Sequence, residues 1–400
     1  MERIYDVIIW GASGFTGRLV VDYIEQRQKQ SNLTWAVAGR SESKIKQILA
    51  GRDVPLLLAD SHDKKSLIEL VKKTKVILTT VGPYARYGSE LVEACAENGT
   101  HYCDLTGEVH WMRKMISQYN YAAKDSGARI VHTCGFDSIP SDIGVYFLQK
   151  EMNERHNVNA KHIKYRTRGF AGGASGGTVD SLMSMMEQAK EDPSILKIIS
   201  NPYALNDKEK GQDGPDKMIP FYDDDFDAWV GPFIMAGINT RVVRRTNELL
   251  NNIYGKDFSY DEGSITGKGP GGLIGATTSG IVTGGMAGMA GFSPTRSIMK
   301  RFLPKPGEGP SEKAMDNGYF EVELLGIHPD DRGKDIRVWI EGDKDPGYKS
   351  TSKMIAESAL ALAQDELSVG GGFWTPASAM GDSLIKRLPD AGVTFTVMEK

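Results

Sequence analysis

The sequence has few cysteines, no strong excess of either charge and no apolar leader. The three cysteines, Cys95, Cys103 and Cys134, lack metal-ligand spacing and are odd in number, so we expect buried reduced thiols and no metal site. The 48 basic and 52 acidic residues leave a net charge of −4, which argues against a broad nucleic-acid-binding face. Because the first residues carry charges and no long apolar core, no signal peptide is expected, and the cytoplasm is the default location.

Glycine, in contrast, is abundant, with 45 residues, and it clusters in one uncharged stretch, residues 269–292. This stretch could span a bilayer, which takes about 20 residues, but its many Gly, Ser and Thr residues lower its hydrophobicity. We therefore expect it to contact an apolar substrate or, peripherally, a membrane surface through Ile274, Ile281, Met286 and Met289. Packing in the protein's own core or at a homodimer interface is the alternative.

The first 145 residues alternate short apolar runs with amphipathic segments. Six strands are predicted, over residues 6–10, 34–38, 56–59, 76–81, 101–105 and 129–133. Amphipathic segments, beginning with residues 15–28, lie between them and predict helices. Near-continuous apolar strands that alternate with helices are typical of a parallel sheet covered on both faces. The sequence therefore predicts an α/β fold that begins with a doubly wound, Rossmann-type domain.

Beyond residue 145 the pattern changes to a period of two, which is typical of half-exposed antiparallel strands. Such strands are expected over residues 163–167, 319–325 and 336–340, and the last two form a hairpin through residues 329–333. Residues 206–227 are polar and acidic and are interpreted as a surface loop, and residues 305–310 as a linker. A second, α+β domain with an antiparallel sheet is therefore predicted.

Gly11, Gly14 and Gly17 lie between the first predicted strand and the first predicted helix, as in a dinucleotide-binding fingerprint. The first glycine permits a tight turn, the second lets the pyrophosphate approach the backbone, and the third lets the helix pack closely on the strand. The other residues expected to bind the cofactor in this loop are Ser13, Phe15 and Thr16. A merely tight turn between strand and helix is the alternative.

Arg40 and Ser41 end the second predicted strand, where NAD enzymes usually carry Asp or Glu. A guanidinium can pair with a ribose 2′-phosphate and stack on adenine, and a serine can donate to the same phosphate. The sequence therefore predicts NADP(H) as the cofactor, with a solvated arginine as the alternative.

Polar residues follow the later strands of the predicted sheet, at the edge where a doubly wound fold binds its ligands. Against the cofactor we expect Val81, Gly82 and Pro83. The candidate catalytic residues are Tyr84, Asp104, Asp137 and Ser138. Tyr84 and Ser138 could donate to a developing enolate or alkoxide, and the two carboxylates could act as acid or base. Helix capping and a rim position for the tyrosine are the alternatives.

At these residues the chain resembles the saccharopine dehydrogenase-like oxidoreductases, which include the trans-acting enoyl reductases of bacterial lipid synthesis. The matching segments are GASGFTG, WAVAGRS, VGPYARYG, CDLTGE, CGFDSIPSDIG, GGASGGT, VVRRT, DPGYKST and GGFWTPASAMGDSLIKRL, which together extend over nearly the whole length. The resemblance implies an NADP(H)-binding Rossmann domain (residues 1–145), an α+β substrate domain (146–349) and a C-terminal segment (350–400) that returns to the first. It also implies nicotinamide chemistry on lipid-like or polyketide substrates, with membrane or lipid-droplet association in some members.

We therefore favour hydride transfer from NADPH to an enoyl or carbonyl group of a lipid-like substrate. A saccharopine-type amino-acid dehydrogenase is a second hypothesis, but its anionic substrate would call for clustered cations. For that role the chain offers mainly Arg86, Arg113, Arg166 and Arg168. A non-catalytic NADP(H)-binding scaffold or redox sensor at membranes is a third hypothesis, because no acid or base stands out from the sequence.

Overall fold

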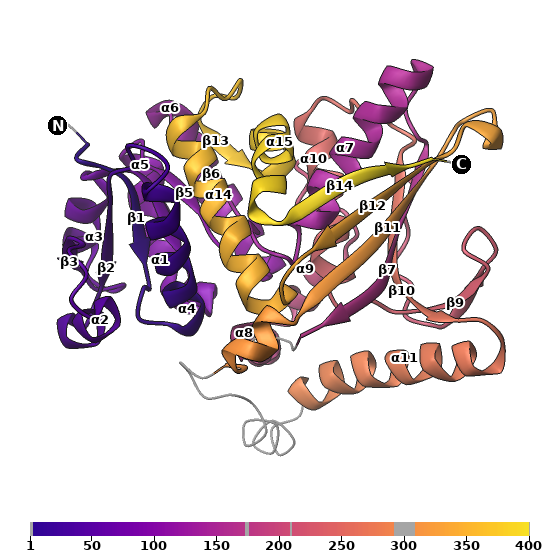
Figure 1. The fold of residues 1–400 in the computed structure, drawn as a ribbon, viewed down its shortest axis with the longest axis horizontal. Helices are drawn as coiled ribbons and strands as arrows, with labels where there is room; N and C mark the ends of the chain where they lie inside the picture. The colour runs from indigo at the N-terminus through magenta and orange to yellow at the C-terminus, as the bar shows by residue number, and fades with distance from the viewer. Residues whose placement is uncertain (1–2, 173–175, 209, 292–308, 400) are drawn as a thin grey trace.

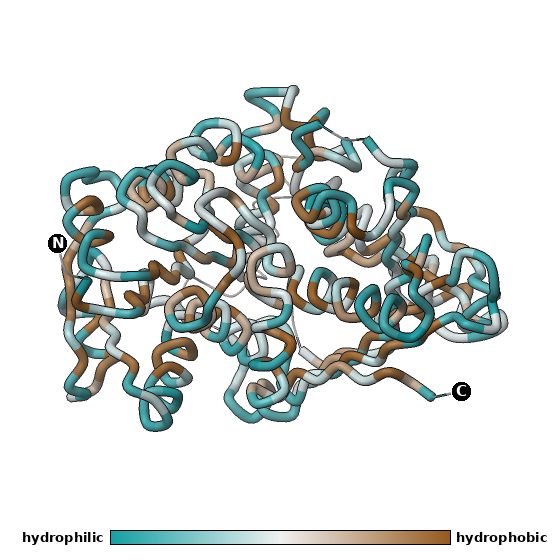
Figure 2. Tube along the Cα trace, turned by 90° about the horizontal axis from the view of Figure 1, so that it is seen from above, coloured by the Kyte–Doolittle hydropathy of each residue, from teal (hydrophilic) through white to brown (hydrophobic). Residues whose placement is uncertain are grey.

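In a computed structural model of the protein, two seven-stranded sheets lie side by side with helices packed around them (Figure 1). The structure describes residues 3–172, 176–208, 210–291 and 309–399, without the side chains of residues 178–179 and 286–291. Most of the segment predicted as a linker, residues 305–310, lies outside this description, as do the side chains of Met286 and Met289. Seen from above, hydrophobic and hydrophilic stretches alternate along the chain (Figure 2), as expected for elements with one buried face.

The first sheet is parallel throughout, with strand order β13-β6-β5-β4-β1-β2-β3. Its strands are β1 (Tyr5–Trp10), β2 (Trp35–Gly39), β3 (Leu56–Leu58), β4 (Thr74–Thr79), β5 (His101–Cys103), β6 (Arg129–Val131) and β13 (Gly372–Trp374). All six predicted strands are present, and the prediction of a doubly wound Rossmann-type sheet is confirmed. The seventh strand, β13, comes from near the C-terminal end and extends the sheet beside β6.

Helices cover both faces of this sheet, which is why the central strands have buried apolar residues on both faces. Val7 and Ile9 of β1 face a core formed with α1 (Phe15–Gln28) and α14 (Thr351–Gln364). Ile8 and Trp10 face the opposite core. The helices on that side are α3 (Lys64–Val71), α5 (Ser89–Glu97) and α6 (Val109–Ser126). Two shorter helices lie at the edge of the domain, α2 (Glu42–Leu49) and α4 (Tyr84–Tyr87).

The second sheet has the order β14-β12-β11-β7-β10-β9-β8 and is antiparallel except for the parallel pair β7 and β10. Its strands are β7 (His162–Ala171), β8 (Phe221–Asp223), β9 (Ala228–Gly231), β10 (Ser259–Gly267), β11 (Tyr319–Ile327), β12 (Ile336–Gly342) and β14 (Val393–Met398). The predicted hairpin is confirmed as β11 and β12, which are joined through a short 3-10 turn at Arg332–Lys334. The predicted second, α+β part with an antiparallel sheet is therefore confirmed, and the sheet includes one parallel pair.

The remaining helices connect the two sheets or pack on the second one. They are α7 (Ile139–His156), α8 (Gly176–Glu191), α9 (Ser194–Ser200), α10 (Ala236–Leu249), α11 (Gly269–Gly291), α13 (Glu312–Asp316) and α15 (Pro376–Arg387). Two short turns complete the chain, a π-helical one at Pro346–Ser350 and a 3-10 one at Pro389–Ala391. Residues beyond 350 contribute α14 and β13 to the first sheet and β14 to the second, and α15 packs against α7 and α14.

The acidic stretch 206–227 differs from the predicted solvated loop, because it includes β8 and its carboxylates neutralise buried cations. Asp213 lies 2.6 Å from Arg244 Nε. Asp223 lies 2.8 Å from the guanidinium of Arg166, which is fully buried. Composition alone predicted a loop because the cationic partners lie on β7 and α10, which are distant in the sequence.

The glycine-rich stretch forms α11, a long helix beneath the second sheet (Figure 1). Its small residues face the sheet, since Ala276 is buried and packs against Gly231 of β9. Its larger apolar residues face outward: Leu273, Ile274, Ile281 and Val282 are 39, 67, 69 and 54% exposed. In the described part of the chain, no helix has the length and apolar character needed to cross a bilayer.

Candidate active site

The glycine loop lies between β1 and α1. Gly11 has a φ of +95°, and a Cβ on it would lie 2.5 Å from Cγ2 of Val81. A Cβ on Gly17 would lie 2.2 Å from the carbonyl oxygen of Gly11. Gly14 is different, because it is exposed and its Cβ would meet only the Gly11 oxygen, at 3.4 Å. The protein itself therefore requires glycine at positions 11 and 17, whereas position 14 leaves open space beside the helix.

Hydrogen-bond donors at the start of α1 have no partner of their own. Among the described residues, no side chain caps this helix at Gly14, and its first turn carries no acidic residue. The backbone N–H groups around Phe15 and Thr16 are therefore available to an anion, and the helix dipole favours one there. Ser13 lies partly buried in the same loop. This cradle fits the pyrophosphate of a dinucleotide.

The side chain of Phe15 has a structural role. Its ring lies 4.7 Å from that of Tyr348, in an edge-to-face contact. A Cβ on Gly309 would lie 2.4 Å from Cζ of Phe15, so the chain there passes directly over the ring. Residues from the second half of the chain thus cover the glycine loop at Phe15. Only the backbone N–H group of Phe15 is left to bind a phosphate.

Arg40 and Ser41 directly follow β2. Arg40 is exposed and forms no hydrogen bond or ion pair with the residues that the structure describes. Ser41 precedes α2, but its hydroxyl bonds to no backbone N–H of that helix and lies 3.3 Å from Oγ of Ser43. Both residues can therefore reach a phosphate on the adenosine ribose. Gly82 is exposed, and Val81 lies beside Gly11, so the loop after β4 borders the glycine loop.

Asp104 lies fully buried at the end of β5, and its carboxylate is directed into the protein. Its Oδ2 accepts the hydroxyl of Tyr102 at 2.8 Å and lies 2.7 Å from Nδ1 of His132. Its Oδ1 accepts the backbone N–H groups of Thr106 and Thr133, at 3.0 and 3.2 Å. Asp104 thus ties the ends of β5 and β6 together and offers no free oxygen to a substrate.

Tyr84 begins α4 and is only 4% exposed, with a hydroxyl that bonds to the backbone. The hydroxyl donates to the Thr79 carbonyl at 3.3 Å and accepts the N–H of Leu105 at 3.1 Å. Burial, reinforced by the nearby Asp104, raises the pKa of Tyr84 well above its usual value. The phenol therefore keeps its proton and donates it to the backbone carbonyl of Thr79.

Glu108 is a site residue that sequence reasoning missed. Its two oxygens accept the backbone N–H groups of Tyr84 and Ala85, at 2.7 and 2.9 Å, and thereby cap α4. Ser181 of α8 donates to the same carboxylate at 3.0 Å. Burial raises the pKa of Glu108. The CDLTGE motif contains this residue, but nothing in its spacing reveals that the side chain reaches back to α4.

Asp137 and Ser138 both follow β6, but they differ in burial and in their hydrogen-bond partners. Ser138 is fully buried, and its hydroxyl donates to Oδ1 of Asn239 at 3.0 Å. Asp137 is partly exposed, and no described residue forms a hydrogen bond or an ion pair with its carboxyl group. Burial raises the pKa of Asp137 to about 6. Of the four candidate catalytic residues, Asp137 is therefore the one whose functional group is not already held by the protein.

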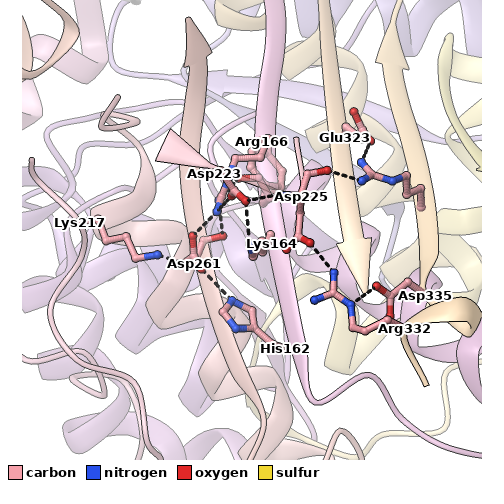
Figure 3. Close-up of polar contacts among 12 residues, drawn as sticks. His162, Lys164, Arg166, Lys217, Asp223, Asp225, Asp261, Glu323, Arg332 and Asp335 are labelled. Atoms are coloured by element: carbon pink, nitrogen blue, oxygen red, sulfur yellow. Dashed lines mark hydrogen bonds and ion pairs between the residues drawn. The ribbon is translucent and has the colours of Figure 1, made fainter. Parts of the chain in front are cut away.

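The four arginines considered for an anionic substrate are each paired with a carboxylate. Arg86 lies 2.9 Å from Glu187, and Arg113 lies 2.8 Å from Asp207. On β7, Arg166 pairs with Asp223 at 2.8 Å and with Asp261 at 2.7 Å, and Arg168 pairs with Glu323 at 2.5 Å. Figure 3 shows the ion-pair network around Arg166 on the second sheet. Arg166 and Arg168 both lie over the ring of Phe226, but the charge of each of the four arginines is already balanced by a carboxylate.

Comparison with known proteins identifies the family to which this chain belongs. The model of the saccharopine dehydrogenase NADP binding domain matches residues 7–131. A Mycobacterium tuberculosis protein, provisionally named a trans-acting enoyl reductase, is 39% identical over 416 residues, covering 98% of this chain and 97% of that protein. The trans-acting enoyl reductase of Mycobacterium bovis is 36% identical over 423 residues, covering 98% of each chain. The chain belongs to the saccharopine dehydrogenase-like oxidoreductase family.

Solved structures agree on the fold of this family member. Saccharopine dehydrogenase (L-Glu forming) of Saccharomyces cerevisiae superposes with a TM-score of 0.53 at 12% identity, covering 99% of this chain and 100% of that one. Homospermidine synthase of Legionella pneumophila, solved with NAD, gives a TM-score of 0.53 at 10% identity, with 99 and 91% covered. Such identities show the fold alone. The family model shows the cofactor, and the first domain of this oxidoreductase binds NADP(H).

Replacement of Arg40 tests how the cofactor is selected. We expect the wild type to bind NADPH more tightly than NADH, and Arg40→Asp to erase or reverse this preference. Loss of a charge-assisted phosphate contact costs about 1.5 to 3 kcal/mol, which is roughly a 10- to 150-fold change in the dissociation constant. Titration calorimetry with both cofactors measures it. Lys29→Asp, at the far end of α1, is the charge-matched control. Equal affinities in the wild type would contradict the assignment.

Proposed function

We propose that this oxidoreductase transfers hydride from NADPH to an enoyl C=C bond, or to a carbonyl group, of a lipid-like substrate. The observation that carries the proposal is the near full-length similarity to proteins named as trans-acting enoyl reductases. The charge distribution supports an apolar substrate, because the arginines that could hold an anionic amino acid are already paired. A free carboxyl group at the strand ends, that of Asp137, supplies an acid for the reduction.

In this proposal the bound NADPH supplies the hydride. The N–H groups at the start of α1 hold the pyrophosphate, and Arg40 with Ser41 holds the 2′-phosphate. The loops after β4 and β6 border the nicotinamide end of the site. Asp137, when protonated, donates a proton to the substrate atom that gains electron density. Asp104 and Glu108 fix the loops that carry these groups.

NADPH consumption over a substrate panel tests this function. The panel contains 2-enoyl thioesters of increasing chain length, matched ketones, and a 2-oxo acid with an amino acid as the saccharopine-type pair. We expect the long-chain enoyl thioesters to be reduced fastest. Turnover of the amino-acid pair alone would establish an amino-acid dehydrogenase. Tight NADPH binding with no turnover at all would favour a non-catalytic scaffold or redox sensor.

We also propose that the outer face of α11 contacts lipid, as an acyl chain or a membrane surface. Ile274 and Ile281 are two turns apart on this face, at 67 and 69% exposure, and Ile219, at 78% exposure, lies in the segment just before β8. The inner face of α11 packs on the second sheet and contacts α8, which also reaches the strand ends through Ser181 and Glu108. The exposed apolar residues therefore lie on a helix connected to the candidate site.

Charged substitutions on α11 test this contact. The double variant Ile274→Asp and Ile281→Asp should reduce co-sedimentation with phospholipid vesicles by roughly tenfold or more. Burial of one exposed isoleucine in lipid contributes about 1.5 to 3 kcal/mol to the free energy of binding. NADPH affinity should not change. Ile253→Asp, at a 56% exposed position near the end of α10, is the matched control. Conversion of a dimer to a monomer in light scattering would instead identify a subunit interface, and loss of folding would identify structural core.

A further inference from the structure

A buried chain of hydrogen bonds connects the loop that carries Asp137 to the second sheet. The Ser138 hydroxyl donates to Oδ1 of Asn239 on α10 at 3.0 Å. Nδ2 of Asn239 donates to Oε2 of Glu262 on β10 at 3.0 Å, and the Tyr260 hydroxyl donates to Oε1 at 2.7 Å. All four side chains are at most 3% exposed. The loop between β6 and α7 is therefore held from the second sheet by a side-chain contact.

The charge of Glu262 decides which groups donate and which accept in this series of hydrogen bonds. A carboxylate can only accept hydrogen bonds, so the Nδ2 group of Asn239 must face it. Oδ1 of Asn239 then accepts the Ser138 proton, which explains why Ser138 does not cap the helix that follows it. A protonated Glu262 can donate to Asn239, and the amide then turns by 180°. Asn239 would then donate to Ser138, whose own proton would lose its acceptor.

Protons can reach Glu262 from outside. A surface cavity of about 140 Å³ is lined by Glu262, Tyr260 and Lys217, among others. Burial raises the pKa of Glu262 to about 7, against the opposing effect of its hydrogen bonds to Tyr260 and Asn239. The other titratable, charged or hydroxyl groups around it or along the same cavity are Ser141, His162, Tyr165, Arg166, Asp213, Asp216, Arg244 and Asp261.

We propose that Asn239 and Glu262 are positioning residues that form a proton-sensitive clamp on the loop of residues 135–138. With Glu262 ionised, the clamp holds Ser138 and thereby fixes the adjacent Asp137. With Glu262 protonated, the clamp reverses and the loop loosens. The consequence for turnover rests on the proposed reductase function, whereas the clamp itself does not.

Hydrogen exchange of the full-length chain tests the positioning role without any substrate. In Asn239→Leu, amides of residues 135–142 should exchange about fivefold or more faster than in the wild type, as expected for a lost buried hydrogen bond. The matched control is Asn247→Leu on the same helix, where Asn247 bonds to Tyr254 N–H and the Gly255 carbonyl, both at 2.9 Å. Equal exchange of residues 135–142 in the two variants would overturn the proposal.

Glu262→Gln tests the proton dependence. Its amide keeps the shape of the glutamate but does not titrate, so the clamp can no longer respond to pH. Corrected for the intrinsic pH effect, wild-type exchange of residues 135–142 should slow as the pH rises through about 7, while exchange in the variant should not change with pH. The ratio of wild-type to variant kcat should rise over the same range. The same exchange rates in both proteins at every pH would overturn the clamp. If hydrogen exchange behaves as expected but no enoyl substrate is turned over, only the proposed reductase function would be overturned.

Discussion

Gly14→Val is expected to abolish NADPH binding while the protein stays folded. Gly14 has φ −74° and ψ 166°, which valine adopts without strain, and a Cβ there meets only one backbone atom, at 3.4 Å. The added methyl groups would therefore fill the open space beside the start of α1, where the pyrophosphate must approach the backbone. We expect the dissociation constant to rise by at least about a hundredfold, which corresponds to about 2.7 kcal/mol.

Calorimetry with NADPH, together with thermal unfolding, measures both parts of this expectation. Gly17→Val provides the contrast, because its Cβ would lie 2.2 Å from a backbone oxygen and 3.0 Å from Cα of Ala12. That variant should lose stability as well as binding, since the helix can no longer pack on the strand. Normal NADPH binding by Gly14→Val would show that the pyrophosphate lies elsewhere.

Asp137→Asn is expected to lower kcat by about 10²- to 10⁴-fold, the usual contribution of a general acid. An acid must be protonated to donate, so the wild-type rate should fall as the pH rises through about 6, the pKa that burial gives Asp137. The variant cannot titrate, and this decrease should disappear. NADPH affinity should stay within a few fold, because in our proposal the carboxyl group acts on the substrate and does not hold the cofactor.

Stability separates this role from a structural one. The pKa of Asp137 is raised in the folded protein from 3.8 to about 6, so the wild type loses stability as the pH rises through that window. Asp137→Asn avoids this loss and should unfold at an equal or higher temperature at pH 7. Asp104→Asn should behave in the opposite way, because it breaks the contact between Asp104 and His132 at 2.7 Å. An unchanged kcat and pH profile in Asp137→Asn would remove Asp137 from the mechanism.

The sequence by itself determined the first sheet and its phosphate loop, because both depend on local signals. The central residues of strands such as β1, Val7 to Trp10, are continuously apolar because helices cover both faces of the sheet, and that pattern is visible in a few consecutive residues. The backbone geometry that requires glycine in the loop is also local, because Gly11 and Gly17 are only six residues apart. The prediction of NADP(H) also depended on two adjacent residues, Arg40 and Ser41, and the family model supports that cofactor.

Only the tertiary structure decided which polar residue at the strand ends remains free. Asp104 is directed inward by His132, 28 residues away, and Ser138 by Asn239, 101 residues away. No local pattern encodes such pairings, because the first partners meet only when β5 pairs with β6, and Ser138 meets Asn239 only when α10 packs against α7. The orientation of α11 has the same origin. Its composition showed an uncharged glycine-rich stretch, but the close approach to Gly231 of β9 turned the small residues inward and left Ile274 and Ile281 exposed.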